Sequence, residues 1–223
     1  MKKFTILFII LLASISHAQT AQDSINDPQK QLNSAQRILS GNYGKAITVG
    51  VYGEMTYNQP EGQNGELDVQ RMVLLFGYKF NDKTQFVTEV EIEHVEEVFV
   101  EQAFVNYSVA DNISLRGGLM LVPMGIINEY HEPTTFNGVE RPAVDNAIVP
   151  TTWREMGVGL TGRIPEASIS YQAYIFNGFK STENKDGEVT GFLKGNNGLR
   201  SGRQKGIQST IDSPTFSTKI EYY

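Results

Sequence analysis

The stretch TQFVTEVEIEHVE alternates acidic and apolar residues along most of its length. Glu89, Glu91 and Glu93 occupy every second position, and Val90 and Ile92 lie between them. Because a strand points successive side chains to opposite faces, one face of this segment is acidic and the other is apolar. A chain rich in such segments must form a sheet with one polar and one apolar side.

The same period of two recurs along most of the chain, in segments of about 10 to 13 residues, which is longer than the strands of most soluble proteins. At roughly 3.3 Å per residue and a tilt of about 45°, each segment spans roughly 25 Å, the height of the apolar band of an outer-membrane barrel. An all-β fold of about eight antiparallel strands is therefore predicted. The predicted strands are residues 45–57, 67–80, 84–96, 96–109, 113–122, 153–164, 168–178 and 215–223.

The connections alternate in length. Short turns follow Phe80, Val109 and Ile164, and longer loops follow Tyr57, Val122 and Asn177; the turn near residue 95 is the one short connection out of place. Short turns at one end and long loops at the other are typical of a transmembrane β-barrel. The two longest loops, 123–152 and 179–206, lack a period of two, and loops of that length are usually functional or disordered.

The first 18 residues predict a signal peptide. Lys2 and Lys3 precede the apolar run 4–13, and Ser16-His17-Ala18 supplies small residues before a cleavage site after Ala18. The apolar run is shorter than a membrane-spanning helix and fits an export signal. Residues 19–44 form a polar N-terminal linker or periplasmic segment with a short helix from Pro28 to Leu39, and residues 45–223 form the barrel domain.

Composition excludes several classes of protein. The chain has no Cys, so disulfides and thiolate metal sites are ruled out. Removing Lys2 and Lys3 with the signal peptide takes the formal charge from -6 to -8, which argues against nucleic acid as a partner. No stretch beyond Ala18 is apolar for 18 residues, so a helical membrane protein is excluded.

The two faces of the predicted sheet receive different environments. We expect Phe86, Val90 and Ile92 to contact lipid, because a charge on the lipid face costs several kcal/mol near the midplane. The acids expected to face a water-filled lumen are Glu54, Glu89, Glu91 and Glu93. A soluble β-sandwich binding module with one wet face predicts the same alternation and is the alternative.

The central block of the chain carries motifs of a known family. These motifs are LVPMG at a strand end, FNGVERP in the following loop, and PTTWREMGVG where strand pattern resumes. Upstream VQRMVLLFGYKFNDKTQFVTEVEIEH and downstream YQAYIFNGF and LRSGRQKG also fit. From about Ile47 onward the chain resembles the phosphate-selective porin O and P family, most closely its Bacteroidetes-type members.

The resemblance implies a sixteen-stranded barrel of roughly twice this length, often trimeric, in the outer membrane. We therefore expect this chain to be the N-terminal half of such a barrel. In the last strand Phe216, Ile220 and Tyr222 share a stripe that is out of phase with Tyr223, which favours an interrupted strand. A complete small barrel is the other interpretation.

The resemblance also implies a passive channel for small, phosphate-like anions, lined by Arg and Lys. Arginine suits phosphate because its planar group binds two oxygens at once. Arg154 has the parity of Met156, so we expect it to point outward. Each candidate cation could instead pair with a lumen acid and stiffen the wall, and the acidic lumen fits a general diffusion pore equally well. The candidates are Arg71, Lys79, Arg116 and Arg163 on the inner stripe and Arg141 in the loop.

Nothing in the chain predicts an enzyme. EYHEP offers Glu129, His131 and Glu132, but their spacing is not a recognised ligand motif, so no metal site is predicted. No catalytic residues and no cofactor are predicted. The expected partners are outer-membrane lipid and small solutes, with a homotrimer as a candidate assembly and no nucleic acid.

Overall fold

The computed structural model describes residues 32–41, 46–147, 149, 151–186, 188–191, 193 and 198–223. The chain divides into two units, Met1–Gln31 and Leu32–Tyr223, and only the second is described. The predicted signal peptide and the first part of the predicted linker lie outside the described residues.

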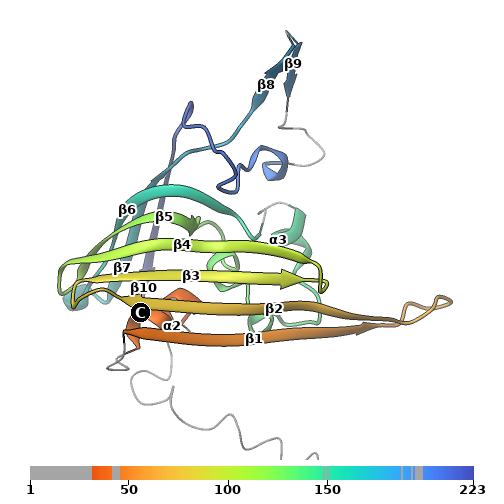
Figure 1. The fold of residues 1–223 in the computed structure, drawn as a ribbon, viewed down its shortest axis with the longest axis horizontal. Coiled ribbons are helices and arrows are strands. Elements are labelled where there is room, and N and C mark those ends of the chain that lie inside the picture. The colour runs from red at the N-terminus through yellow and green to blue at the C-terminus, as the bar shows by residue number, and fades with distance from the viewer. Residues whose placement is uncertain are drawn as a thin grey trace, which may run out of the picture. The chain divides into compact units, whose positions relative to one another are not determined.

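One antiparallel sheet dominates the described unit (Figure 1). Eight strands are hydrogen-bonded in the order β1-β2-β3-β4-β5-β6-β7-β10. They are β1 (Ile47–Asn58), β2 (Glu66–Lys79), β3 (Thr84–Glu93), β4 (Glu97–Ala110), β5 (Ile113–Leu121), β6 (Arg154–Ile164), β7 (Ile169–Phe176) and β10 (Thr215–Tyr222). A separate hairpin, β8 (Thr182–Lys185) and β9 (Glu188–Gly191), lies in the loop between β7 and β10.

The all-β prediction is confirmed: every predicted strand is present within a few residues of its expected bounds. Closure into a barrel is not seen, since β1 and β10 pair with β2 and β7 and not with each other within the described residues. A sandwich is not seen either, because the other described sheet is the small hairpin of β8 and β9.

Alternation decides which side chains each face carries. In β2, Arg71, Val73 and Leu75 are buried on the inner face, whereas Met72 and Phe76 are exposed on the outer face. Each strand repeats this arrangement, because successive side chains leave a strand on opposite sides. The outer face is thus a continuous apolar surface, and the inner face carries the charges.

Helix α2 (Ser34–Ser40) lies on the inner face of the sheet. Asn33 and Gln36 form a reciprocal capping box at its start, and Gly41 is the C-cap, as expected. Ile38 packs where Gly77 leaves room, because a Cβ on Gly77 would lie 2.4 Å from Ile38 Cγ2. The helix begins six residues later than predicted, and its docking turns this part of the predicted linker into a cover for β2 and β3.

The long connection between β5 and β6 also covers the inner face. It contains three short helical turns, of which the first is fixed by Asn128, whose side chain bonds to the backbone of Val122 and Trp153. Trp153 in turn packs against Phe179 of the next long loop. The helical turns are η1 (Asn128–Tyr130), η2 (Pro133–Thr135) and α3 (Ala143–Ala147), followed later in the chain by η3 (Pro165–Ala167) and η4 (Arg200–Gly202).

Among the described residues, the structure contains no helix with the length and apolar character needed to cross a membrane.

Candidate functional site

A β-bulge in β4 creates the centre of the inner face. Glu89 pairs with Gln102 whereas Val90 pairs with Val100, so Glu101 is an extra residue in β4. A bulge shifts the alternation of a strand, and here both Glu101 and Gln102 are buried. Strict alternation would have placed Glu101 with Ala103 and Val105 on the outer face. The sequence analysis missed Glu101, and no local sequence signal marks the bulge.

Glu101 lies beside two acids that were predicted for the inner face. Glu89 and Glu91 are 0% and 2% exposed, and Glu101 is 1% exposed. Glu89 accepts hydrogen bonds from Gln102 Nε2 at 2.7 Å and from Ser34 Oγ of α2 at 3.2 Å. The expected location on the inner side is present, but helix and loop cover these acids, so they do not face open water.

His131 reaches the acids from the long loop. Its Nε2 lies 2.9 Å from Glu101 Oε2, and its Nδ1 lies 3.0 Å from the carbonyl oxygen of Asn128. Burial lowers the pKa of His131, but the negative charge and hydrogen bond of Glu101 outweigh this and raise it to about 9. The imidazole is therefore held as a cation among carboxylates.

Two arginines complete this buried network. Arg71 lies between two acids, with Nε 2.8 Å from Glu54 Oε2 and NH1 3.0 Å from Glu91 Oε1. Arg154 NH1 lies 3.9 Å from Glu101 Oε1. The outward orientation expected for Arg154 is wrong: the residue is buried and packs against the Phe99 ring, because loops cover this end of β6.

The remaining predicted cations are dispersed. Arg116 lies on the inner face, donates to Asn106 Oδ1 at 2.9 Å and contacts the Phe104 ring. Lys79 pairs with Asp82 at the β2–β3 turn, and Arg163 is exposed at the end of β6. These sites place one cation within the sheet and two near the turns.

Arg141 lies in the long loop, at a cavity of about 170 Å³ that is also lined by Glu54, Glu93 and Arg71. Its NH1 donates to Thr151 Oγ1 at 3.3 Å. Burial and the nearby charge of Arg71 lower the pKa of Arg141. Glu140 next to it is exposed and accepts from Asn58 Nδ2 at 3.0 Å.

The three polar residues of EYHEP diverge to three partners. Glu129 accepts from Lys219 Nζ of β10 at 2.8 Å and from Gln172 Nε2 of β7 at 2.9 Å. Glu132 pairs with Arg37 of α2, and His131 meets Glu101. The structure does not bring Glu129, His131 and Glu132 together around one point. Instead this segment joins β4, β10 and α2.

A cationic group on the two long loops was missed by the sequence analysis. Gln204 N donates to Glu155 Oε1 at 2.9 Å, and Arg203 NH1 donates to the carbonyl of Thr152 at 3.2 Å, so SGRQKG docks on β6. Burial, with the charges of Arg200, Arg154 and Arg141, lowers the pKa of Arg203 to about 10. The pKa of Lys205 is lowered by burial and by Arg203 first among its neighbours. The group comprises Arg141, Arg154, Arg200, Arg203 and Lys205.

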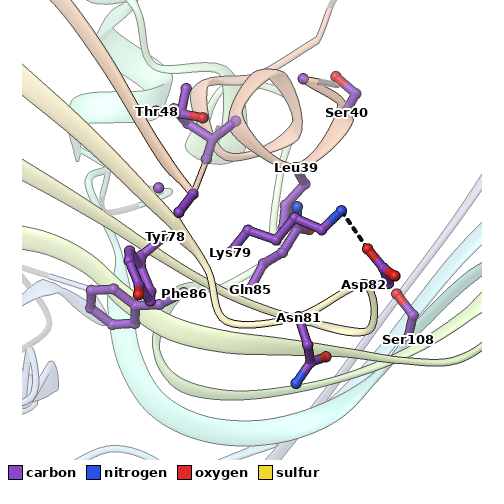
Figure 2. Close-up of a pocket in the computed structure, with 14 residues that line it drawn as sticks. Leu39, Ser40, Thr48, Tyr78, Lys79, Asn81, Asp82, Gln85, Phe86 and Ser108 are labelled. Carbon is purple, nitrogen blue, oxygen red and sulfur yellow. Dashed lines mark ion pairs between the residues drawn. The ribbon is translucent and has the colours of Figure 1, made fainter. Parts of the chain in front are cut away.

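A larger cavity opens at the other end of the inner face, beside the short turns (Figure 2). It has a volume of about 520 Å³ and lies between the C-terminal end of α2 and the strands β1 to β3. Figure 2 shows Lys79 and Asp82 at its rim, joined by an ion pair of 2.9 Å. The N-terminal end of α2 leaves only about 20 Å³ beside Phe104 and Arg116, so the helix fills the middle of the inner face.

Comparison with known proteins now identifies the family. The model of the family described as phosphate-selective porin O and P matches residues 43–201. The chain belongs to this porin family. The resemblance drawn from LVPMG, FNGVERP and the strand restart is thereby confirmed.

Two individual proteins are also similar to the chain. An uncharacterized protein of Aquifex aeolicus (strain VF5) is 40% identical over 188 residues, which are 80% of this chain and 41% of the relative. The chain thus spans about two fifths of that relative's length. OmpTdeltaL8, a loop L8 deletion mutant of the Vibrio cholerae outer membrane protein OmpT, matches 66% of this chain and 60% of its own at 10% identity. Its TM-score of 0.30 is too low to carry an argument.

Proposed function

We propose that the chain forms the wall of an outer-membrane porin that passes small solutes by passive diffusion. The observation that carries this proposal is the inverted distribution of polarity, in which apolar side chains cover the exposed outer face while charges occupy the inner one. A soluble protein with this outer face would expose far more contiguous apolar surface than is usual. In a bilayer the same face is buried in hydrocarbon.

The outer face has the composition that lipid requires. Val158, Leu160 and Ile175 are all about half exposed, and they lie on neighbouring strands β6 and β7. Aromatic residues Tyr57 and Phe80 lie near strand ends, where an interfacial girdle is expected. The outer apolar surface extends over β1 to β10 through residues such as Val49, Met72, Val105, Leu115 and Phe216.

The edges of the sheet must be paired for this function. β1 and β10 carry backbone groups with no strand partner on one side, and hydrocarbon does not tolerate unpaired backbone groups. We therefore expect both edges to be paired in the membrane, either with each other or with further strands.

Anionic solutes are the proposed cargo. The loop cations Arg141, Arg154 and Arg203 lie close enough to repel one another, and an arrangement of this kind attracts a soluble anion. In contrast, the acids Glu89, Glu91 and Glu101 have their charges compensated locally by His131 and arginines. The inner acids therefore do not by themselves exclude anions from the path beside the loops. We propose no catalytic activity.

Vesicle flotation and planar-bilayer conductance test the proposal. The refolded chain should float with lipid vesicles and show heat-dependent gel migration. Its longer relative should conduct in a planar bilayer, and the chain itself should conduct only if its edges are paired. A chain that stays soluble without detergent and does not float would refute the membrane assignment.

Ion selectivity tests the anionic cargo on whichever protein conducts, at the positions aligned with this chain. Arg203→Glu should shift the reversal potential in a KCl gradient toward cation selectivity. The matched control is Arg163→Glu, which introduces the same charge change at an exposed turn and should leave the potential unchanged. Equal shifts for the two variants would contradict the role of the loop cations.

A further inference from the structure

We propose that Glu89, Glu101 and His131 bind one divalent transition-metal ion at the point where the wall, helix α2 and the long loop meet. This site differs from the Glu129, His131 and Glu132 set of the sequence analysis, and it goes beyond the channel function. Only His131 is common to both sets.

The candidate ligands converge from separate parts of the chain. One ligand atom from each of Glu89, Glu101 and His131 lies within 4.8 Å of the others, and all three residues are buried. Zinc binds imidazole nitrogen and carboxylate oxygen at about 2.0 to 2.2 Å, so its ligand atoms lie at most about 4.4 Å apart. A movement of a few tenths of an ångström would therefore bring all three into range.

Outer partners hold the ligands as metal sites usually require. The His131 Nδ1 hydrogen bond to the Asn128 carbonyl, 3.0 Å long, leaves Nε2 pointing at the carboxylates. Asn128 is itself fixed by three hydrogen bonds to the backbone of Val122 and Trp153. Glu89 is oriented by Gln102 and Ser34. Such partners fix the orientation and tautomer of the first ligands.

The geometry demands a cation between His131 and the acids. Nδ1 faces a carbonyl, which only accepts hydrogen bonds, so Nδ1 must carry a proton. A bare Nε2 lone pair 2.9 Å from Glu101 Oε2 would be repulsive, so a proton or a metal ion must lie between them. Glu89 is fully buried, and among the described residues it has no Lys or Arg nitrogen within 4.0 Å. A dication shared by Glu89, Glu101 and His131 satisfies all three groups.

The donor set indicates the class of metal. One imidazole nitrogen and two carboxylate oxygens suit Zn²⁺, Mn²⁺ or Fe²⁺, whereas Ca²⁺ and Mg²⁺ prefer oxygen ligands alone. A bound ion would connect β3, β4 and the long loop, and through Ser34 also α2. Metal binding would thus stabilise the position of the loop on the wall.

The test uses the untagged full chain, folded in detergent and freed of metal with a chelator. Adding ZnCl₂ or MnCl₂ should raise the thermal unfolding midpoint and give a saturable heat of binding with one ion per chain. Glu89→Gln and Glu101→Gln keep the shape of the side chains, and each should weaken binding at least about tenfold, the lower end of the loss seen even for outer partners. The matched control, Glu132→Gln, alters a neighbouring carboxylate that pairs with Arg37 and should bind like the original chain.

If either Gln variant fails to fold, X-ray absorption of the zinc-loaded original chain decides the question. We expect coordination by nitrogen and oxygen alone with one imidazole. Absence of stoichiometric binding, or equal binding by Glu101→Gln and the original chain, would overturn the proposal and assign the cation beside His131 to a proton.

Discussion

The two faces of the sheet follow opposite rules. On the outer face, side chains such as Val158 and Leu160 are apolar and make few contacts within the chain. On the inner face, Glu89, Glu101 and Arg71 are charged and almost completely buried, each with specific partners. The outer face needs only a chemical class of residue, because lipid is a uniform solvent. The inner face needs particular residues, because each buried charge must meet its own partner.

The largest effect should come from removing one charge of the inner network. Glu101→Leu leaves His131 and Arg154 without their carboxylate, and breaking a buried pair costs about 3 to 5 kcal/mol. Equilibrium unfolding in urea with lipid vesicles measures this loss. The double variant Glu101→Leu with His131→Leu should recover much of it, and a double variant as unstable as the single one would contradict the pairing.

A charge on the outer face should cost somewhat less. Leu160→Arg places a cation near the middle of β6, where the cost on a lipid face is about 2 to 4 kcal/mol. The same unfolding experiment measures it, with Asp111→Arg in an exposed turn as the matched control. If Leu160→Arg is tolerated like the control, this face does not contact lipid.

Filling the space at Gly77 should displace α2 from the inner face. The Cβ of Gly77→Ala would collide with Ile38, and overpacking of this kind costs about 1 to 3 kcal/mol. The chain has no Cys, so a single Ala35→Cys reports the docking of α2 through its rate of labelling. Labelling should accelerate with Gly77→Ala and slow again when Ile38→Ala is added. No acceleration would mean that α2 is held by its polar contacts alone.

The smallest effect is expected at the short turns. Asp82 pairs with Lys79, but its side chain is almost fully exposed, and exposed pairs contribute little. Asp82→Asn should leave the unfolding midpoint unchanged within error in 0.15 M salt, where such pairs are largely screened. A clear loss would show that this end of the sheet depends on specific partners, as the inner network does.

The sequence by itself determined the strands, the turns and which stripe of each strand is apolar. Alternation is local: Val90 and Ile92 are separated from Glu89 and Glu91 by the geometry of an extended backbone, whatever surrounds them. The charged stripe of β3 and the inner positions of Arg71 and Arg116 could therefore be predicted. The family could also be recognised, because its motifs are contiguous.

Only the tertiary structure decided how the inner face is occupied. The bulge that turns Glu101 inward depends on the register between β3 and β4, which alternation within one strand does not reveal. The meeting of His131 with Glu101, and of Ser34 with Glu89, joins residues 30 and 55 positions apart. Arg154 has an outward parity in the sequence, yet it is buried because loops fold over its end of the strand. Contacts across such distances arise when separate segments pack together, and no local pattern encodes them.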